Sequence, residues 1–430
     1  MAFLHAKLEN TIFIRQIPGF RLNDPTLVLR LHVALYGLRQ SAYEFYQLLR
    51  KLLLDIGLVR CEVDHAVFIG RWSTPPTSSI SIPSDGSSLL LIVPVHVDDG
   101  LVITNSVPLY KWFIGELSKS LEIVDLGAGS MYLGMHITRD RPRRKLWISQ
   151  KAATIDLLKN WDMLEVTPTQ VPLTSLPDKF PPAGPNSLPG ITDSDIKITF
   201  QRLVGSLLYL SICSRPDISY AALALSQFNS NPTRSHLLAA KGVLRYLAGT
   251  LDYALEYPTP SDSLPPSVTP HIHACALSDA DWASNSSDRK SISGYAFYFF
   301  GSLISWSSTK QKSIAASSTE SEYYALSHAT REALWIRLFM TINGFPIPRP
   351  FPFLGDNQST LTIANDPSHV NSKRTKHIDV RYHFFREHIS DGTFITVWVP
   401  TGDMIADIFT KPLLSTSFSK HRSALGLVPN

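Results

Sequence analysis

Two adjacent aspartates lie between apolar segments in the stretch VHVDDGLVIT, at positions 95–104. Asp98 and Asp99 follow SLLLIVPV and precede LVIT, and an Asp-Gly pair between strand-like runs is a strong hairpin signal. Carboxylates beside buried strands are costly unless they are paired, hydrogen-bonded or bound to a cation. The pattern predicts a β-hairpin with both aspartates at its tip, and it leaves open what neutralises them.

Four further acids have related settings in the last third of the chain. Asp279 follows the apolar run HACALS, Asp356 ends FPFL, Glu322 lies in the first turn of a helical segment, and Asp407 starts the final one. In open sheets, chemistry gathers at strand ends and adjoining helix starts. Four carboxylates converging there would bind two hard cations such as Mg²⁺. Two ions about 4 Å apart can activate a water and stabilise the leaving oxygen of a phosphodiester. The alternative is that each acid is an ordinary cap or turn residue.

The elements that must position Asp98 and Asp99 are predicted from periodicity. Residues 35–57 form a helix in which Leu38, Phe45, Leu49, Leu52 and Ile56 make one apolar stripe, and Gly57 ends it. HAVFIG and SLLLIVPVHV are strands joined by an enlarged hairpin loop at 73–88. A strand KLWISQ and a helix KAATIDLLKNWDM follow.

The rest of the chain is divided by two Pro/Ser-rich stretches, Val171–Gly190 and Tyr257–Pro270, which indicate linkers. The block Phe200–Tyr257 between them is mostly helical. The last block begins with strands, continues with a helix over 318–342, and ends in alternating strands and helices, the last beginning at Ala406–Leu413. This order predicts a mixed sheet flanked by helices, and the whole chain is expected to be a multidomain α+β or α/β protein.

Composition bounds the class of protein. The chain has 430 residues, of which 44% are hydrophobic and 18% charged, with a net charge of +4, so two or three globular domains are expected. Three scattered cysteines give no disulfide framework and no CxxC metal site. The N-terminus lacks a signal-peptide layout, and the longest apolar run, near Leu89–Val95, is far shorter than the ~20 residues of a membrane helix. We therefore expect an intracellular protein without a membrane partner.

Three other features have two interpretations each. His271, His273 and Cys275 alternate on one expected strand, which suggests either a zinc site or a half-buried strand; the second is favoured because no partner pair has finger spacing. Basic residues near one C-terminal helix either contact phosphates or form a solvated surface: Lys373, Arg374, Lys376, His377, Arg381 and Arg386. Four tryptophans are expected as core anchors rather than base-stacking platforms: Trp282, Trp306, Trp335 and Trp398.

Taken in order along the chain, several motifs resemble copia-type retrotransposon polyproteins. LYGLRQSAYEFY, DHAVFI, VHVDDGLVIT and DLGAGSMYLGMHITRD resemble the reverse transcriptase of these elements, and GSLLYLSICSRPDISYA and HLLAAKGVLRYLAGT resemble the connecting region. SDADWAS, SSTESEYYAL, DNQSTLTIA and ADIFTKPL resemble the ribonuclease H domain. The resemblance implies three segments: a truncated reverse transcriptase at 1–170, with palm and thumb but without the fingers and the first catalytic strand, a linker and helical connection at 171–270, and a ribonuclease H-like domain at 271–425.

The resemblance also implies roles for the acids. Asp98 and Asp99 match the aspartate pair that holds two Mg²⁺ for nucleotide addition, with His96 in place of the usual Tyr. Asp279, Glu322, Asp356 and Asp407 match the four acids that hold two Mg²⁺ for cutting RNA in an RNA–DNA hybrid; Mn²⁺ is an alternative ion. Glu320 is the rival to Glu322, which is preferred because it lies three residues before Ala325, as the matching acid does.

The polymerase match lacks one part. A third carboxylate is expected in a D-V-K-x-A-F-L-type strand, and the resemblance begins after that position, so the acid would precede Met1. We therefore expect impaired RNA-directed DNA synthesis beside retained hybrid cleavage. The alternative is a decayed, non-catalytic nucleic-acid-binding remnant. The expected partners are template-primer and hybrid nucleic acids, and the expected location is the cytoplasm, in particles, with the nucleus as an alternative.

Overall fold

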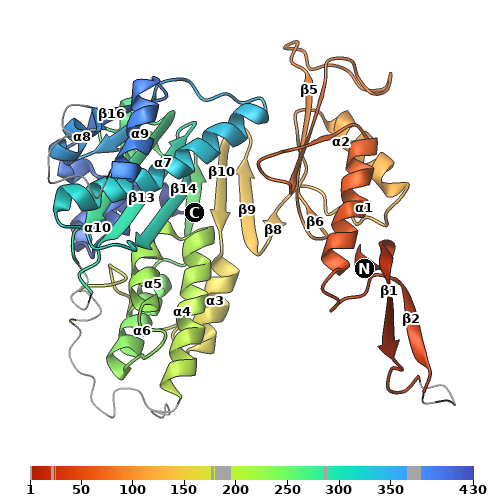
Figure 1. Ribbon diagram of the computed structural model, residues 1–430, viewed down its shortest axis with the longest axis horizontal. Helices are drawn as coiled ribbons and strands as arrows, with labels where there is room; N and C mark the ends of the chain where they lie inside the picture. Colours follow the sequence, from red (N-terminus) through yellow and green to blue (C-terminus); the bar gives the residue numbers. More distant parts are fainter. Residues whose placement is uncertain are drawn as a thin grey trace. The chain divides into compact units, whose positions relative to one another are not determined.

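The computed structural model describes residues 2–20, 24, 26–175, 179, 195–284, 288–365 and 379–430. The chain forms two compact units (Figure 1). Unit 1 comprises Met1–Leu133 and Leu338–Phe345, and unit 2 comprises Gly134–Arg337 and Pro346–Asn430. The units divide the chain by packing, whereas the three segments given above follow a resemblance, so that segmentation stays a prediction.

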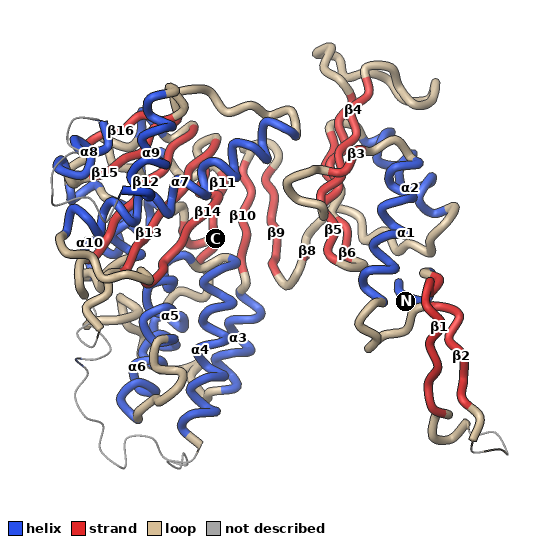
Figure 2. Tube along the Cα trace, in the orientation of Figure 1, coloured by secondary structure: helices blue, strands red, loops and turns tan. Residues whose placement is uncertain are grey.

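Unit 1 packs two helices and an antiparallel sheet around one core. The sheet has the order β3-β4-β5-β6, β7 also pairs with β5, and a separate hairpin joins β1 and β2 (Figure 2). The elements are η1 (Ala2–His5), β1 (Lys7–Arg15), β2 (Val28–Val33), α1 (Ser41–Asp55), β3 (Val59–Arg60), β4 (Val67–Trp72), β5 (Leu89–His96), β6 (Asp99–Gly100), β7 (Ile103–Thr104), α2 (Val107–Ser118) and β8 (Met131–Tyr132).

The hairpin loop predicted in unit 1 is confirmed, and the helix predicted over 35–57 is present but shorter, because α1 begins at Ser41 and leaves Leu38 outside it. Phe45 and Leu49 of the apolar stripe are buried, together with Leu53, and the chain reverses at Gly57, whose φ of 100° suits glycine. Strands β4 and β5 pair with Trp72 opposite Leu89, so residues 73–88 form the expected long loop. The β5 burial alternates, as expected for a sheet with one face on the core.

Unit 2 contains, among its described residues, a mixed sheet of five strands in the order β14-β13-β12-β15-β16. Strands β12, β13 and β14 are antiparallel, while β15 and β16 run parallel to β12. This is the predicted mixed sheet. Its elements are β12 (Ala274–Asp281), β13 (Ile292–Phe299), β14 (Ser302–Lys310), α7 (Ser318–Ile342), β15 (Phe351–Gly355), α8 (Gln358–Asn365), α9 (Asp379–Ser390), β16 (Phe394–Trp398), η9 (Thr401–Asp403), η10 (Ile405–Phe409) and α10 (Ser415–Ala424).

A second sheet and a group of helices complete unit 2. Strand β10 pairs with β9 and β11, and β11 pairs with β17. Their bounds are β9 (Met135–Asp140), β10 (Lys145–Ser149), α3 (Lys151–Asn160), α4 (Ile196–Cys213), η4 (Pro216–Ile218), α5 (Ser219–Ser226), α6 (Arg234–Ala248), β11 (Tyr253–Tyr257), η5 (Ser261–Ser263), η6 (Thr269–His271) and β17 (Leu427–Pro429). The helices share one apolar core with the mixed sheet.

Three local predictions are wrong. Tyr253–Tyr257, assigned to the helical block and the second linker, is strand β11, because β10 and β17 provide pairing partners that no local pattern reveals. The final helix is α10, and Ile405–Phe409 forms a 3₁₀ turn. His271 ends the 3₁₀ turn η6 and His273 precedes β12, so His271, His273 and Cys275 do not alternate along one strand.

Helix α4 is long and apolar enough to cross a membrane, by length and composition only. The longest uninterrupted apolar run, near Leu89–Val95, does not reveal this helix, because polar residues interrupt the apolar residues of α4. Phe200, Leu203 and Leu207 of α4 are fully buried in the core of unit 2. Ile198, Tyr209 and Ile212 of the same helix are exposed and 39% of the segment is buried, so this packing accounts for only part of its apolar composition.

Candidate active site

Asp279 and Asp356 are brought together by the parallel pairing of β12 and β15. The register aligns Ala276 with Phe353 and Leu277 with Leu354. Asp279 lies two residues after Leu277, and Asp356 lies two residues after Leu354. Because the two strands are parallel, both aspartates lie at the same edge of the sheet. Asp279 is buried, with 2% of its surface exposed, and Asp356 is half-buried just beyond β15. The predicted position of Asp356 at a strand end is confirmed, whereas Asp279 lies within β12, which continues to Asp281.

Helix α7 supplies Glu322 and directs Glu320 elsewhere. The two residues are two positions apart, which places them about 200° apart around an α-helix. The Glu320 carboxylate accepts hydrogen bonds from the Ala316 backbone N–H at 2.7 Å and from the Tyr324 hydroxyl at 2.9 Å, so it stabilises the start of the helix. The geometry favours Glu322 over its rival for the acid cluster.

Asp279, Glu322 and Asp356 form one cluster of acids. One carboxylate oxygen from each lies within 4.8 Å of the others. The pKa of Glu322 is raised well above its ordinary value, first by burial, then by the charges of Asp279 and Asp356, and by a hydrogen bond with Asp279. Such mutual repulsion among hard oxygen ligands is what a bound divalent cation relieves.

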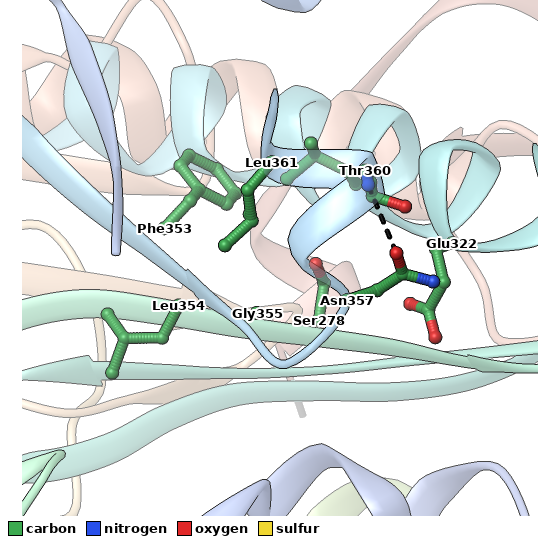
Figure 3. Close-up of a pocket in the computed structure, with 9 residues that line it drawn as sticks. Ser278, Glu322, Phe353, Leu354, Gly355, Asn357, Thr360 and Leu361 are labelled. Atoms are coloured by element: carbon green, nitrogen blue, oxygen red, sulfur yellow. Dashed lines mark hydrogen bonds between the residues drawn. The ribbon is translucent and has the colours of Figure 1, made fainter. Parts of the chain in front are cut away.

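A pocket adjoins the cluster between α7, β15 and the start of α8 (Figure 3). The Glu322 carboxylate, Ser278 and Asn357 supply its polar groups, and the side chains of Phe353 and Leu361 contribute its apolar wall. The Asn357 side chain accepts a hydrogen bond from the Thr360 N–H at 3.0 Å and so holds the first turn of α8. This cap fixes the chain immediately after Asp356.

Asp407 approaches Asp279 from the turn η10. A Cβ at Gly294 of β13, which pairs with Asp279, would lie only 2.6 Å from the Phe409 Cβ; glycine therefore lets this turn lie against the sheet. The Thr410 hydroxyl donates a hydrogen bond to Asp279 Oδ2. Burial, and then the charge of Asp279, raise the pKa of Asp407 to about 8.

Lys411 is the cation that the structure places among these acids. Its Nζ lies 2.8 Å from Asp407 Oδ1 and 4.0 Å from Asp279 Oδ2. The Lys411 charge also acts on Asp281, which lies two residues beyond Asp279 on β12. Burial raises the pKa of Asp281, whereas the positive charge of Lys411 lowers it. The sequence analysis missed Lys411, Thr410 and Asp281, although Lys411 lies four positions after Asp407, a spacing that pairs side chains on one helical turn.

The other predicted contacts are placed differently. Arg386 is buried and its guanidinium donates to the Ile363 carbonyl, which contradicts both a phosphate contact and a solvated surface for this residue. Lys373, Arg374, Lys376 and His377 lie outside the described residues, as does the side chain of Arg381. Trp282 and Trp335 are 45% exposed and Trp398 is 50% exposed, so these three are not core anchors, whereas Trp306 packs against the core.

Comparison with known proteins places the chain in a family. A family model described as reverse transcriptase (RNA-dependent DNA polymerase) matches residues 1–175. The chain is 32% identical over 433 aligned residues to the retrovirus-related Pol polyprotein from transposon TNT 1-94 of Nicotiana tabacum, covering 100% of this chain and 30% of the relative. It is 35% identical to that from transposon RE1 of Arabidopsis thaliana, covering 99% of this chain and 27% of the relative. The chain belongs to the copia-type retrotransposon polyproteins.

As a copia-type polyprotein sequence, the chain spans less than a third of the length of these two relatives. Among solved structures, LC11-RNase H1 in complex with an RNA/DNA hybrid aligns with a TM-score of 0.25 and 11% identity, covering 32% of this chain and 93% of that one.

The structure confirms the predicted hairpin that carries Asp98 and Asp99, and this hairpin lies within the residues that match the reverse transcriptase model. His96 pairs with Asp99, Val97 has a φ of 57°, and Asp98 occupies the turn. Both aspartates are exposed at the tip, so water solvates their charges. Among the described residues, neither belongs to a group of three acidic, histidine or cysteine ligands.

The buried acids of this copia-type chain predict an unusual pH dependence of stability. The folded pKa values of Glu322 and Asp407 exceed the unfolded values near 4, so the folded state binds more protons up to pH ~8 and unfolding becomes easier as pH rises. His421 opposes this below pH ~6.5, because burial lowers its pKa to about 4. The metal-free chain should therefore lose thermal stability between pH ~6.5 and ~8, by roughly 2–4 °C per kcal/mol lost.

Thermal unfolding followed by circular dichroism in a chelating buffer measures this effect. Adding Mg²⁺ should remove most of the fall, because a bound cation favours the ionised carboxylates. The E322Q variant, which lacks one of the two groups, should show a smaller fall. A melting temperature that is constant or rises over this interval in the metal-free protein would contradict the assigned pKa directions.

Proposed function

We propose that unit 2 is a Mg²⁺-dependent ribonuclease that cuts the RNA strand of an RNA–DNA hybrid. The observation that carries this proposal is the convergence of Asp279, Glu322 and Asp356 within 4.8 Å, with Asp407 beside Asp279. Those four acids are the ones that the family resemblance assigns to hybrid cleavage. We interpret the sheet of order β14-β13-β12-β15-β16 as ribonuclease H-like on the same grounds.

The residues present fit divalent cations. Three carboxylates with repelling charges offer oxygen ligands, which Mg²⁺ prefers, and Mn²⁺ accepts the same set. When bound, such ions supply an activated water and stabilise the leaving oxygen of the phosphodiester. Asp279 is the shared member, since it faces Glu322 and Asp356 on one side and Asp407 with Lys411 on the other.

The chain's own groups prepare this site. The Thr410 hydroxyl holds one oxygen of Asp279 by its hydrogen bond, which restrains the rotation of that carboxylate. Burial and two neighbouring acids raise the pKa of Glu322, which favours its protonated form in the metal-free protein, and the carboxylate must be ionised to serve as a ligand. The Asn357 cap keeps Asp356 at the strand end.

Trp398 provides a test of the substrate. Its ring is 50% exposed and its Nε1 donates to the Asp356 carbonyl at 3.1 Å, so an aromatic face lies beside the acid cluster. Stacking on a base is worth about 1–3 kcal/mol, so W398A should weaken binding of a hybrid in Ca²⁺ by roughly 5–150-fold. W398F, which keeps a ring but loses the N–H, should bind nearly as well as wild type.

Trp335 is the matched control for this experiment. It is 45% exposed and lies on α7, about 20 Å along the helix from Glu322. Fluorescence anisotropy of a labelled hybrid should give W335A the wild-type affinity. Equal affinities for W398A and wild type would remove Trp398 from the substrate contact.

RNA-directed DNA synthesis is the second candidate function, and the reverse transcriptase match to residues 1–175 favours it. We interpret unit 1 as containing part of a palm with Asp98 and Asp99 as its metal-binding pair. Two exposed carboxylates without a third ligand among the described residues form a weaker site than the cluster of unit 2. We therefore propose hybrid cleavage as the principal activity and weak polymerisation beside it.

A cleavage assay tests the proposed function. The purified full chain, with Mg²⁺ and a labelled RNA–DNA hybrid, should yield short RNA products, and it should leave single-stranded RNA and duplex DNA intact. Absence of metal-dependent products, with hybrid binding retained, would support the alternative of a non-catalytic nucleic-acid-binding remnant.

A further inference from the structure

The Lys411 side chain places a positive charge between two carboxylates of the candidate site. It lies between Asp407, at 2.8 Å, and Asp279, at 4.0 Å, while Asp279 also belongs to the cluster with Glu322 and Asp356. Asp279 therefore separates two groups of acids. The group of three carboxylates meets this ammonium at Asp279, 4.0 Å away, whereas the other group holds it 2.8 Å from Asp407.

The local fold holds the ammonium there. Lys411 follows η10 and lies four positions after Asp407, so backbone geometry turns both side chains toward Asp279. The Lys411 N–H donates to the Asp407 carbonyl at 3.3 Å, and the Thr410 N–H donates to the same carbonyl at 3.1 Å, which closes the turn. One third of the Lys411 side chain remains exposed, so the ammonium can move toward solvent.

We propose that Lys411 is a built-in cation between Asp279 and Asp407, which a second divalent ion must displace in order to bind. The inference deepens the proposed function and rests on the same acids. Its consequence is an asymmetric site. The first ion binds at Asp279, Glu322 and Asp356, which the Lys411 ammonium approaches no closer than 4.0 Å, and the second binds more weakly because it must displace the ammonium that lies 2.8 Å from Asp407. Lys411 is a positioning residue in this scheme, since it acts through Asp407.

Isothermal titration calorimetry, in which Mn²⁺ is added to the metal-free full chain, tests the inference. Wild type should show one tighter and one weaker binding step. K411M, which keeps the side-chain length without the charge, should strengthen the weaker step by about tenfold or more, because the incoming ion no longer competes with an ammonium for the same carboxylates. K411R should restore the wild-type asymmetry. K420M should leave it unchanged, since Lys420 pairs with Asp403 at 2.9 Å.

A second measurement uses the wild-type protein and so does not depend on how the variants fold. Reductive methylation with peptide mass spectrometry reports how accessible the Lys411 amine is. Lys411 should be methylated several-fold faster when Mn²⁺ saturates both steps than when it saturates only the first, and Lys420 should show no change. The inference would be overturned if folded K411M bound the second Mn²⁺ ion no more tightly than wild type does. It would also be overturned if the methylation rate of Lys411 stayed the same when the second ion binds.

These measurements also separate the inference from the proposed function. Neither the titration nor the methylation requires a substrate or turnover. If wild type cuts hybrids and K411M leaves the second step unaltered, the function stands and the inference fails. If the second step strengthens in K411M and wild type cuts no hybrid, the inference stands and the function fails.

Discussion

The D356N variant is expected to lose hybrid cleavage by about 10³-fold or more while keeping its fold. Asp356 contributes one of three oxygens that lie within 4.8 Å, and an amide cannot replace its charge at a divalent cation. The fold should survive because the substitution removes one of the charges that raise the pKa of Glu322, so repulsion in the metal-free cluster decreases. Initial rates of RNA release and a thermal melt measure the two halves of this prediction.

Glu320 and Glu322 supply a matched pair of variants on one helix. E322Q should lose cleavage as D356N does. E320Q should keep the wild-type rate and lower stability by about 1 kcal/mol, because its carboxylate accepts the Ala316 N–H at the start of α7. If D356N and E322Q cut hybrids at the wild-type rate, or if E320Q alone loses activity, the acid assignment is wrong.

Primer extension by the chain is expected to run several orders of magnitude more slowly than hybrid cleavage in the same buffer. Electrostatic stabilisation by correctly placed ions is usually the largest catalytic contribution. Asp98 and Asp99 are exposed at the tip of the β5–β6 hairpin, and among the described residues no third acid joins them. Two carboxylates therefore lack the geometry and charge for two well-placed ions.

A labelled primer on an RNA template, extended beside the cleavage assay, checks this prediction. The double variant D98N/D99N gives the background, because any synthesis that survives it does not come from this site. Robust Mg²⁺-dependent extension that disappears in the double variant would contradict the prediction, and would show that the hairpin pair recruits a further ligand.

Local sequence patterns predicted helices and strands well where the spacing of apolar residues matched the face of the element that is buried. Helix α7 begins at Ser318 and ends at Ile342, as expected, and the loop at 73–88 joins β4 and β5. The strand-end position of Asp356 also followed from an apolar run, and the parallel register then brought Asp279 and Asp356 together. The preference for Glu322 came from the family resemblance, and the 200° angular separation from Glu320 agrees with it.

What could not be predicted depends on contacts distant in the sequence. Strand β11 exists because β10 and β17 flank it, and nothing in its own residues distinguishes it from the linker that follows. Lys411 is the principal omission: its role depends on Asp279, which reaches it only through the packing of η10 on β13. The exposure of Trp398 likewise depends on which face of β16 the surrounding elements leave uncovered.

Anomalous diffraction from crystals of the full chain grown with Mn²⁺ tests the central claim most directly. The account predicts a strong peak about 2.2 Å from carboxylate oxygens of Asp279, Glu322 and Asp356. It predicts a weaker second peak between Asp279 and Asp407, accompanied by a displaced Lys411. A map in which manganese avoids these carboxylates, and in which the three side chains point to separate surfaces, would contradict it.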